Sequence, residues 1–188
     1  MSRGPVLRIL FTRLRAEEKL LAEAARRQGI PVDLADVTDR VFGAALPAEA
    51  GDVVLARCVS HGKNEAVAGM QEARGFRVAN PSSVMAHWGD KLRTTLALER
   101  GGVAQPRWRT ALSEEGALEA AEELGYPVVF KRLVGSWGRL LAKANDREAA
   151  EAVVEHKAQL GAAHRTFYLQ EYVHKGGFDV RAFVVGGE

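Results

Sequence analysis

A glycine-rich loop lies between two apolar runs in the stretch VVFKRLVGSWGRLLAK, residues 128–143. A phosphate group is held by backbone N–H groups that converge on it, which requires glycine, and by cationic side chains that offset its charge. The small residues that could supply the N–H groups are Gly135, Ser136 and Gly138. The basic residues that could supply the charge are Lys131, Arg132 and Arg139. The alternative is a surface hairpin whose glycines only form its turn, and for this loop alone that alternative is the stronger one.

A lysine next to a helix-breaking residue is a second candidate for phosphate binding. Gly89, Asp90 and Lys91 lie inside a helical stretch, where glycine costs roughly 1 kcal/mol relative to alanine. The glycine can mark a break that points Lys91 into a site. A surface lysine on one continuous helix fits the same residues.

Polar residues on two apolar runs near the C-terminal end complete the set of candidates. The first run ends in four residues whose backbone could bind the edge of an adenine ring, or which simply end a strand: Gln170, Glu171, Tyr172 and Val173. Asp179 and Arg181 lie two residues apart in the next run, so they share a face of the predicted strand. They could bind a ribose hydroxyl and a phosphate, or form only an exposed ion pair.

Strands alternate with helices in the first 80 residues. The apolar runs predict strands over 6–11, 32–37, 52–57 and 76–79. Helical spacing with glycine stops predicts helices over 16–29 and 64–74. This alternation is typical of an open α/β layer with a parallel sheet.

The rest of the chain predicts a different architecture. Helices are predicted over 82–102, 113–125 and 147–160. Strands are predicted over 106–112, 128–133, 140–144, 166–173 and 178–185. Two strands joined by a short loop, with helices elsewhere, indicate an antiparallel sheet covered on one face. Because the last predicted strand runs into the turn signal VVGGE, we expect the chain to be a fragment.

Composition excludes several classes of protein. Hydrophobic residues make up 47% of the chain and charged residues 27%, which is ordinary for a globular protein and excludes a disordered one. The net charge of +2 is spread along the chain and predicts neither a nucleic-acid surface nor a membrane tail. Cys58 is the single cysteine and the five histidines lack metal-ligand spacing, so a cytoplasmic protein without a thiolate or histidine metal site is expected.

Taken in order, these motifs resemble the ATP-grasp superfamily. The resemblance rests on the lysine of GDK, the lysine of VVFK, the glycine loop, QEYV, and the run DVRAFVV. Within the superfamily, GSWGRLLAK, EHK, YLQEYV and the earlier RCVS resemble the LysX-type ligases of lysine biosynthesis, in the RimK-like branch. The resemblance covers nearly the whole chain, and its motifs are specific as a set.

The resemblance implies a fold in three parts. Residues 1–84 would form an α/β pre-ATP-grasp domain, and residues 85–173 the small N-terminal ATP-grasp subdomain with a linker helix. Residues 174–188 would hold the first strand of the second subdomain. In this family, ATP lies between two antiparallel sheets.

The resemblance also implies a reaction and its partners. The family transfers the γ-phosphoryl group of ATP to a carboxylate, and an amine then attacks the acyl phosphate to give an amide. LysX-type ligases join the amino group of 2-aminoadipate to the C-terminal glutamate of a small acidic amino-group carrier protein. ATP and Mg²⁺ are the implied cofactors, and homo-oligomers are common among related enzymes.

Roles for individual residues follow from the same resemblance. The implied ATP ligands are Lys91, Lys131, Gly135, Ser136, Trp137, Gly138, Gln170, Glu171, Tyr172, Val173 and Asp179. Arg139 and Arg181 are implied as the catalytic residues, because they would face the phosphate or the substrate.

Two departures from the family accompany the resemblance. Arg132 stands where these enzymes usually have proline. The Mg²⁺ ligands of the family lie beyond residue 188, so the isolated chain is expected not to catalyse ligation. Two alternatives stay open: a RimK-type glutamate ligase acting on a protein or a cofactor, and a nucleotide-binding module without catalysis.

Overall fold

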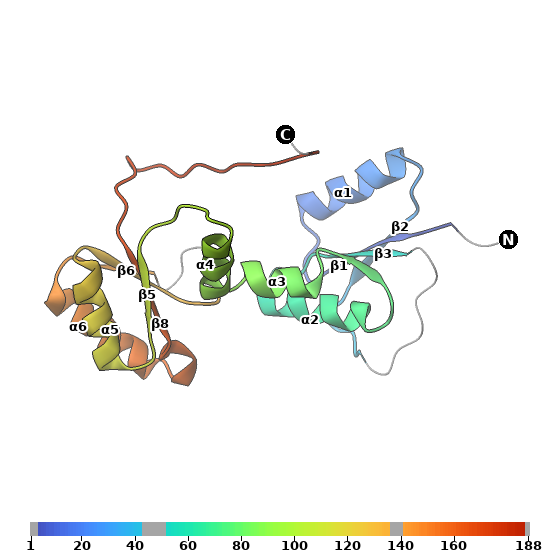
Figure 1. Cartoon of the computed structure of the whole chain (residues 1–188). Coiled ribbons are helices and arrows are strands. Elements are labelled where there is room, and N and C mark those ends of the chain that lie inside the picture. The colour runs from blue at the N-terminus through green and yellow to red at the C-terminus, as the bar shows by residue number, and fades with distance from the viewer. Residues whose placement is uncertain (1–3, 43–51, 136–140, 187–188) are drawn as a thin grey trace. The chain divides into compact units, whose positions relative to one another are not determined.

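The chain divides into two compact units, Met1–Thr94 and Thr95–Glu188. The structure is a computed structural model that describes residues 4–42, 52–135 and 141–186 (Figure 1). Each unit has its own sheet and its own hydrophobic core. The domain boundaries predicted after residues 84 and 173 stay predictions.

The first unit contains a parallel four-stranded sheet in the order β2-β1-β3-β4. Its strands are β1 (Leu7–Phe11), β2 (Val32–Asp36), β3 (Val53–Ala56) and β4 (Arg77–Ala79). Its helices are α1 (Ala16–Arg27), α2 (His61–Glu72) and α3 (Ser82–Trp88). The helix α1 covers one face of the sheet, and α2 and α3 cover the other (Figure 1). Helices on both faces are expected, because right-handed crossovers run from β1 to β2 in one direction and from β3 to β4 in the other.

The core of the first unit follows the alternation of side chains along each strand. Leu10 and Val54 pack with Ala68 of α2 and Met85 of α3 in one cluster. Ile9 is fully buried and, as a neighbour of Leu10 on the strand, points to the opposite face. The near-continuous apolar strands of this unit are those of a parallel sheet buried on both faces.

The second unit contains an antiparallel four-stranded sheet in the order β5-β8-β6-β7. Its strands are β5 (Trp108–Ala111), β6 (Val128–Lys131), β7 (Ala142–Ala144) and β8 (Phe167–Glu171). The helices are α4 (Lys91–Arg100), which spans the division between the units, α5 (Glu114–Leu124), α6 (Arg147–Gln159) and the short η1 (Ala162–His164). The predicted fold class, a parallel α/β layer followed by an antiparallel sheet with helices, is confirmed.

Helices α5 and α6 pack on one face of the second sheet. Their apolar side chains join those of the strands in one core, including Leu124, Val154, Phe130 and Leu169. Each helix begins at a polar cap: Ser113 Oγ accepts a hydrogen bond from Gly116 N at 3.0 Å, and Asp146 Oδ1 accepts one from Ala149 N at 2.9 Å. These caps satisfy backbone donors that the helix itself leaves unpaired.

The helix predicted over 82–102 is divided in the structure. It forms α3 and α4, which are separated at Gly89 and Asp90. A Cβ atom at Gly89 would lie 1.8 Å from Nε2 of His61, so a larger residue here would require the His61 ring to move. The continuous helix predicted over 82–102 is therefore wrong, and the break that Gly89 offered as the alternative is the one observed.

The strand predicted over 178–185 is also wrong. Among the described residues 172–186, the structure contains neither helix nor strand. Gly176 and Gly177 adopt positive φ angles before this segment, and Phe178, Val180 and Phe183 are exposed. A strand needs the backbone of a neighbour for its hydrogen bonds, and within the described part of the chain no segment pairs with these residues.

Candidate functional site

One face of the second sheet carries the polar side chains that the sequence suggested for phosphate binding. Phe167 and Leu169 of β8 point into the core beneath α5 and α6. Tyr168 and Gln170 therefore project from the opposite face. Lys131 ends β6 and pairs with Tyr168 in the antiparallel register, so it lies on this same face.

A chain of contacts joins these side chains. Lys131 Nζ donates a hydrogen bond to Gln170 Oε1, and Gln170 Nε2 donates one to the Tyr168 hydroxyl at 2.7 Å. The Tyr168 hydroxyl lies 2.6 Å from Thr95 Oγ1 of α4. The Trp108 ring stacks against Tyr168 at a centroid distance of 6.1 Å. We call these five residues, Thr95, Trp108, Lys131, Tyr168 and Gln170, the Tyr168 cluster.

The Tyr168 cluster orients an ammonium group. Because the oxygen of the Gln170 amide faces Lys131, the NH₂ group of the amide faces Tyr168, and both ends of the amide are used. Burial raises the pKa of the Tyr168 phenol, so the phenol is neutral at pH 7. The neutral amide of Gln170, held in turn by the Tyr168 hydroxyl, therefore positions the Lys131 ammonium group.

The backbone N–H groups at the end of β8 already have hydrogen-bond partners within the protein, which the sequence did not indicate. Glu171 N donates to Arg107 O at 3.0 Å, and Tyr172 N donates to Pro127 O at 3.1 Å. A ligand that uses N–H groups at this strand end would therefore meet the backbone beyond Tyr172, where Val173 is exposed.

The side chains at this strand end have partners as well. The Glu171 carboxylate accepts hydrogen bonds from Arg107 N at 2.9 Å and from Arg107 Nε at 2.8 Å. These two hydrogen bonds lower the pKa of Glu171, so the side chain is a carboxylate at pH 7. Lys143 Nζ lies 4.1 Å from the centroid of the Tyr172 ring, in a cation–π contact.

The other residues predicted to bind phosphate are Lys91 and those of the glycine-rich loop. Gly135 is exposed with a φ of 155°. Lys91 begins α4 and belongs to the first unit. The candidates in the loop, Ser136, Trp137, Gly138 and Arg139, lie outside the described residues.

Asp179 and Arg181 do not form the shared strand face that the sequence predicted. The segment that holds them is not a strand, and both residues are exposed. Asp179 pairs with Lys175 four residues earlier, and the hydrogen bond from that lysine lowers the pKa of Asp179.

Sequence reasoning missed three members of the Tyr168 cluster: Thr95, Trp108 and Tyr168. The two-residue period of Tyr168, Gln170 and Tyr172 along the predicted strand was a usable signal, because alternate residues share a face. No local signal marks Thr95, since its contact with Tyr168 joins positions 73 residues apart.

A cavity of about 610 Å³ opens in the second unit. It is lined by the segment that follows α4 and by β5, including Trp108 and Thr110. Lys131 and Gln170 do not line it. Ala111 points into the core, so its neighbour Thr110 lies on the opposite face of the sheet, where it pairs with Tyr168 in the register. The cavity that Thr110 lines therefore reaches one edge of the Tyr168 cluster.

In the described part of the chain, no group of three or more His, Cys, Asp or Glu side chains could hold a metal ion. Among residues 4–42, 52–135 and 141–186, no helix combines the length and the apolar character needed to cross a membrane.

Comparisons with known proteins identify both units. Residues 7–87 match the LysX preATP-grasp domain, and residues 89–188 match the RimK-like ATP-grasp domain. The alpha-aminoadipate–LysW ligase LysX of Sulfurisphaera tokodaii is 33% identical over 194 residues, covering 97% of this chain and 66% of that protein. The glutamate–LysW ligase ArgX of the same organism is 33% identical over 176 residues, covering 93% of this chain and 62% of that protein. The chain thus spans 62 to 66% of the length of these relatives.

Solved structures agree with these matches. The RimK domain ATP-grasp protein of Sphaerobacter thermophilus has a TM-score of 0.77 at 28% identity, covering 91% of this chain and 65% of that chain. The ADP complex of purK, an N5-carboxyaminoimidazole ribonucleotide synthetase, has a TM-score of 0.64 at 19% identity and covers 92% of this chain and 48% of that one, which shows a shared fold. Since the RimK-like match includes more than half of the 188 residues, the chain belongs to the RimK-like ATP-grasp family.

Proposed function

We propose that the protein is an ATP-dependent carboxylate–amine ligase in which Lys131 binds the phosphates of ATP. The observation that carries the proposal is the Tyr168 cluster: a lysine at the end of β6 is oriented by Gln170 and Tyr168 on the sheet face opposite α5 and α6. An ammonium group positioned by the neutral amide of Gln170 suits an anionic ligand such as a phosphate. Membership of the RimK-like ATP-grasp family supports ATP as that ligand.

The proposed chemistry has two steps. A carboxylate oxygen of the acceptor attacks the γ-phosphorus of ATP, the bond to the β-phosphate oxygen breaks, and ADP leaves. The amine nitrogen of the second substrate then attacks the acyl carbon, loses a proton and displaces phosphate to form an amide. Phosphorylation is needed because a free carboxylate is a poor electrophile. Positive charge at Lys131 would stabilise the charge that moves onto the phosphates.

The other predicted residues belong to the same proposal. Lys91 would bind phosphate, Asp179 the ribose, and Arg139 and Arg181 the phosphate or the substrate carboxylate. The loop Gly135–Arg139 would cover the phosphates, and Gln170–Val173 would contact the adenine. Within the described residues, the side chains do not offer a set of carboxylates that fits Mg²⁺, so no step of this proposal uses the ion.

The proposed substrates are an amino acid and a LysW-type carrier protein. LysX of Sulfurisphaera tokodaii is an alpha-aminoadipate–LysW ligase and ArgX a glutamate–LysW ligase, and both are 33% identical to this chain. 2-Aminoadipate and glutamate differ by one methylene group, which is worth about 1 to 3 kcal/mol in an apolar pocket. The choice between them depends on the shape of the pocket, and 2-aminoadipate is the substrate that we propose.

Nucleotide binding is the first test of the proposal. ATP is titrated into the 188-residue chain by isothermal calorimetry, and Lys131→Gln is compared with Lys19→Gln. Lys19 is exposed on α1 in the other unit and serves as the matched control. We expect Lys131→Gln to weaken ATP binding by about tenfold or more, because a charge-assisted contact is lost. Equal affinities for the two variants would refute the assignment of Lys131.

Ligation is the second test, and it uses the protein purified from its natural source. Phosphate release is measured with a LysW-type carrier protein and either 2-aminoadipate or glutamate. Release that requires the carrier and 2-aminoadipate supports the proposal. Release with the carrier and glutamate, but not with 2-aminoadipate, would identify glutamate as the amino-acid substrate. ATP binding without any phosphate release would support a nucleotide-binding module without catalysis.

A further inference from the structure

A second cavity lies in the first unit, at the carboxyl ends of its central strands. It has a volume of about 390 Å³, and Arg15, Arg57 and Asn80 contribute to its lining. The strand order β2-β1-β3-β4 reverses direction between β1 and β3. Arg15 follows β1, and Arg57 follows β3 directly. In open α/β sheets, small ligands bind at this reversal, outside the carboxyl ends of the strands.

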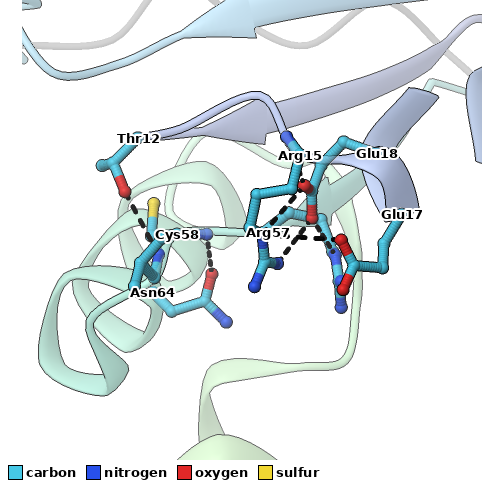
Figure 2. A network of polar contacts seen from close by, with 8 residues as sticks. Thr12, Arg15, Glu17, Glu18, Arg57, Cys58 and Asn64 are labelled. Atoms are coloured by element: carbon cyan, nitrogen blue, oxygen red, sulfur yellow. Dashed lines mark hydrogen bonds and ion pairs between the residues drawn. The ribbon is translucent and has the colours of Figure 1, made fainter.

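Two arginines at this cavity are held by one buried carboxylate. Glu18 is fully buried on α1, and its side chain accepts hydrogen bonds from Arg15 Nη2 at 2.7 Å and from Arg57 Nε at 3.0 Å (Figure 2). It also accepts from Arg15 Nε and from the backbone Arg15 N, both at 3.1 Å. Burial opposes the ionisation of Glu18, but these hydrogen bonds outweigh it and lower the pKa of Glu18 to about 2. The guanidinium groups are therefore fixed before any ligand arrives.

The charges around Glu18 do not cancel. Two guanidinium groups face one buried carboxylate, which leaves one positive charge at the cavity. Glu17 lies 3.9 Å from Arg15 Nε, but its side chain is 60% exposed, so water and salt screen this pair. Within the described part of the chain, the Nη1 and Nη2 groups of Arg57 make no hydrogen bond to protein. This pair of N–H donors has the geometry to bind a carboxylate with two parallel hydrogen bonds.

The rest of the lining selects among anions. Leu21, Met85 and Trp88 contribute apolar surface. Asn64 Oδ1 accepts a hydrogen bond from Cys58 N at 2.7 Å, which fixes the turn after β3. Burial raises the pKa of the Cys58 thiol, so Cys58 lines the cavity as a protonated thiol. An apolar wall beside a guanidinium fork fits a carboxylate on a short aliphatic chain better than it fits inorganic phosphate.

We propose that this cavity, with Arg57 as its anion-binding residue, binds the carboxylate of a small aliphatic amino acid or dicarboxylate. The site lies wholly within the first unit. Identifying its occupant with a substrate of the ligase rests on the proposed function; the carboxylate site itself does not. Arg15 and Glu18 act as positioning residues for Arg57.

The test is calorimetry on the 188-residue chain with glutarate, 2-aminoadipate and inorganic phosphate as separate ligands. We expect the two carboxylates to bind, and phosphate to bind more weakly. Arg57→Gln should weaken glutarate binding by about tenfold or more, since contacts to a charged group are lost. Arg57→Lys should also weaken it, because lysine keeps the charge but loses the fork. The matched control is Arg27→Gln, since Arg27 is exposed and paired only within α1; this variant should bind like the wild type.

Amide chemical shifts of the unmodified chain locate the bound ligand without any variant, so this measurement does not require a variant to fold. Glutarate added to the unmodified chain should shift the signals of residues 55–58 and of Asn80. Shifts elsewhere, equal binding by Arg57→Gln and the wild type, or no binding at millimolar concentrations would each overturn the proposal. Phosphate that binds more tightly than glutarate would overturn the carboxylate assignment. ATP binding measured on the same samples separates the two proposals, because it tests the Tyr168 cluster and not this cavity.

Discussion

The hydroxyl groups of Thr95 and Tyr168 meet at 2.6 Å, which joins α4 to β8 across 73 positions of sequence. Tyr168 is 1% exposed, so its hydroxyl is out of reach of bulk water. A buried hydroxyl must find its partners within the protein, and here Thr95 and Gln170 supply them. This contact therefore fixes the side chain that in turn orients the amide beside Lys131.

Removing the Tyr168 hydroxyl should destabilise the chain. Tyr168→Phe leaves Thr95 Oγ1 and Gln170 Nε2 without this partner, and an unpaired buried polar group costs about 1 to 3 kcal/mol. Urea unfolding should show a loss of that size. Tyr172→Phe is the control, because Tyr172 is only half-buried and its contacts use the ring. A loss no larger than that of the control would contradict the stabilising role of the hydroxyl.

Placing a carboxylate beside Lys131 should weaken nucleotide binding. In Gln170→Glu, the new carboxylate would pair with the ammonium group and offset its charge, and the hydrogen bond donated to Tyr168 would be lost. We expect ATP affinity to fall by about tenfold, measured by calorimetry. Gln159→Glu adds the same charge at an exposed position of α6 and should change the affinity little. If both variants bind ATP equally well, Gln170 does not act through Lys131.

The sequence predicted the layers of the fold better than its last element. Period-two and helical patterns are local, so they predicted the parallel sheet and the helix-covered antiparallel sheet. The run 178–185 carries the same apolar pattern, yet it forms no strand. Strand formation depends on a partner that the pattern does not contain, and the described chain supplies none for this run.

The candidate sites show the same limit. Lys131 and Gln170 were each predicted from their own motifs, but their hydrogen bond depends on the register of β6 and β8. Arg57 and Glu18 lie 39 positions apart, and no spacing rule relates them. Only the parallel order of the strands brings the end of β3 to the start of α1.

Acid should destabilise the first unit through Glu18. The pKa of Glu18 is lowered from 4.5 to about 2 in the folded chain, so its ionised form stabilises folding at pH values above 4.5. This stabilisation, about 3 kcal/mol, is lost as the pH falls from 4.5 towards 2. Urea titrations at several pH values, followed by the amide signals of β1, measure it in this unit.

Substitution of Glu18 tests whether this carboxylate, and not another acidic group, causes the loss of stability in acid. Glu18→Gln should remove the added acid sensitivity between pH 4.5 and 2 and lower stability at pH 7. Glu23→Gln is the control, because Glu23 is 60% exposed and pairs only with Arg27 on the same helix. An acid sensitivity that survives in Glu18→Gln would assign it to a different carboxylate.

Gly89 should resist even the smallest substitution. A Cβ atom there would lie 1.8 Å from Nε2 of His61 and 2.1 Å from its Cε1, so the imidazole ring would have to move. The ring packs edge-on against Trp88 at a centroid distance of 4.9 Å, and its side chain is only 15% exposed. Gly89→Ala should therefore cost about 1 to 3 kcal/mol, as expected for overpacking.

A double-mutant cycle tests this cause directly. In the His61→Ala background the ring is absent, so Gly89→Ala should cost much less than in the wild type. Gly62→Ala makes the same change in α2, where no atom lies within 4 Å of the added Cβ, and it should be neutral or slightly stabilising. Urea unfolding of these variants gives the coupling free energy between positions 61 and 89. A coupling near zero would mean that the break between α3 and α4 requires glycine for a reason other than the His61 ring.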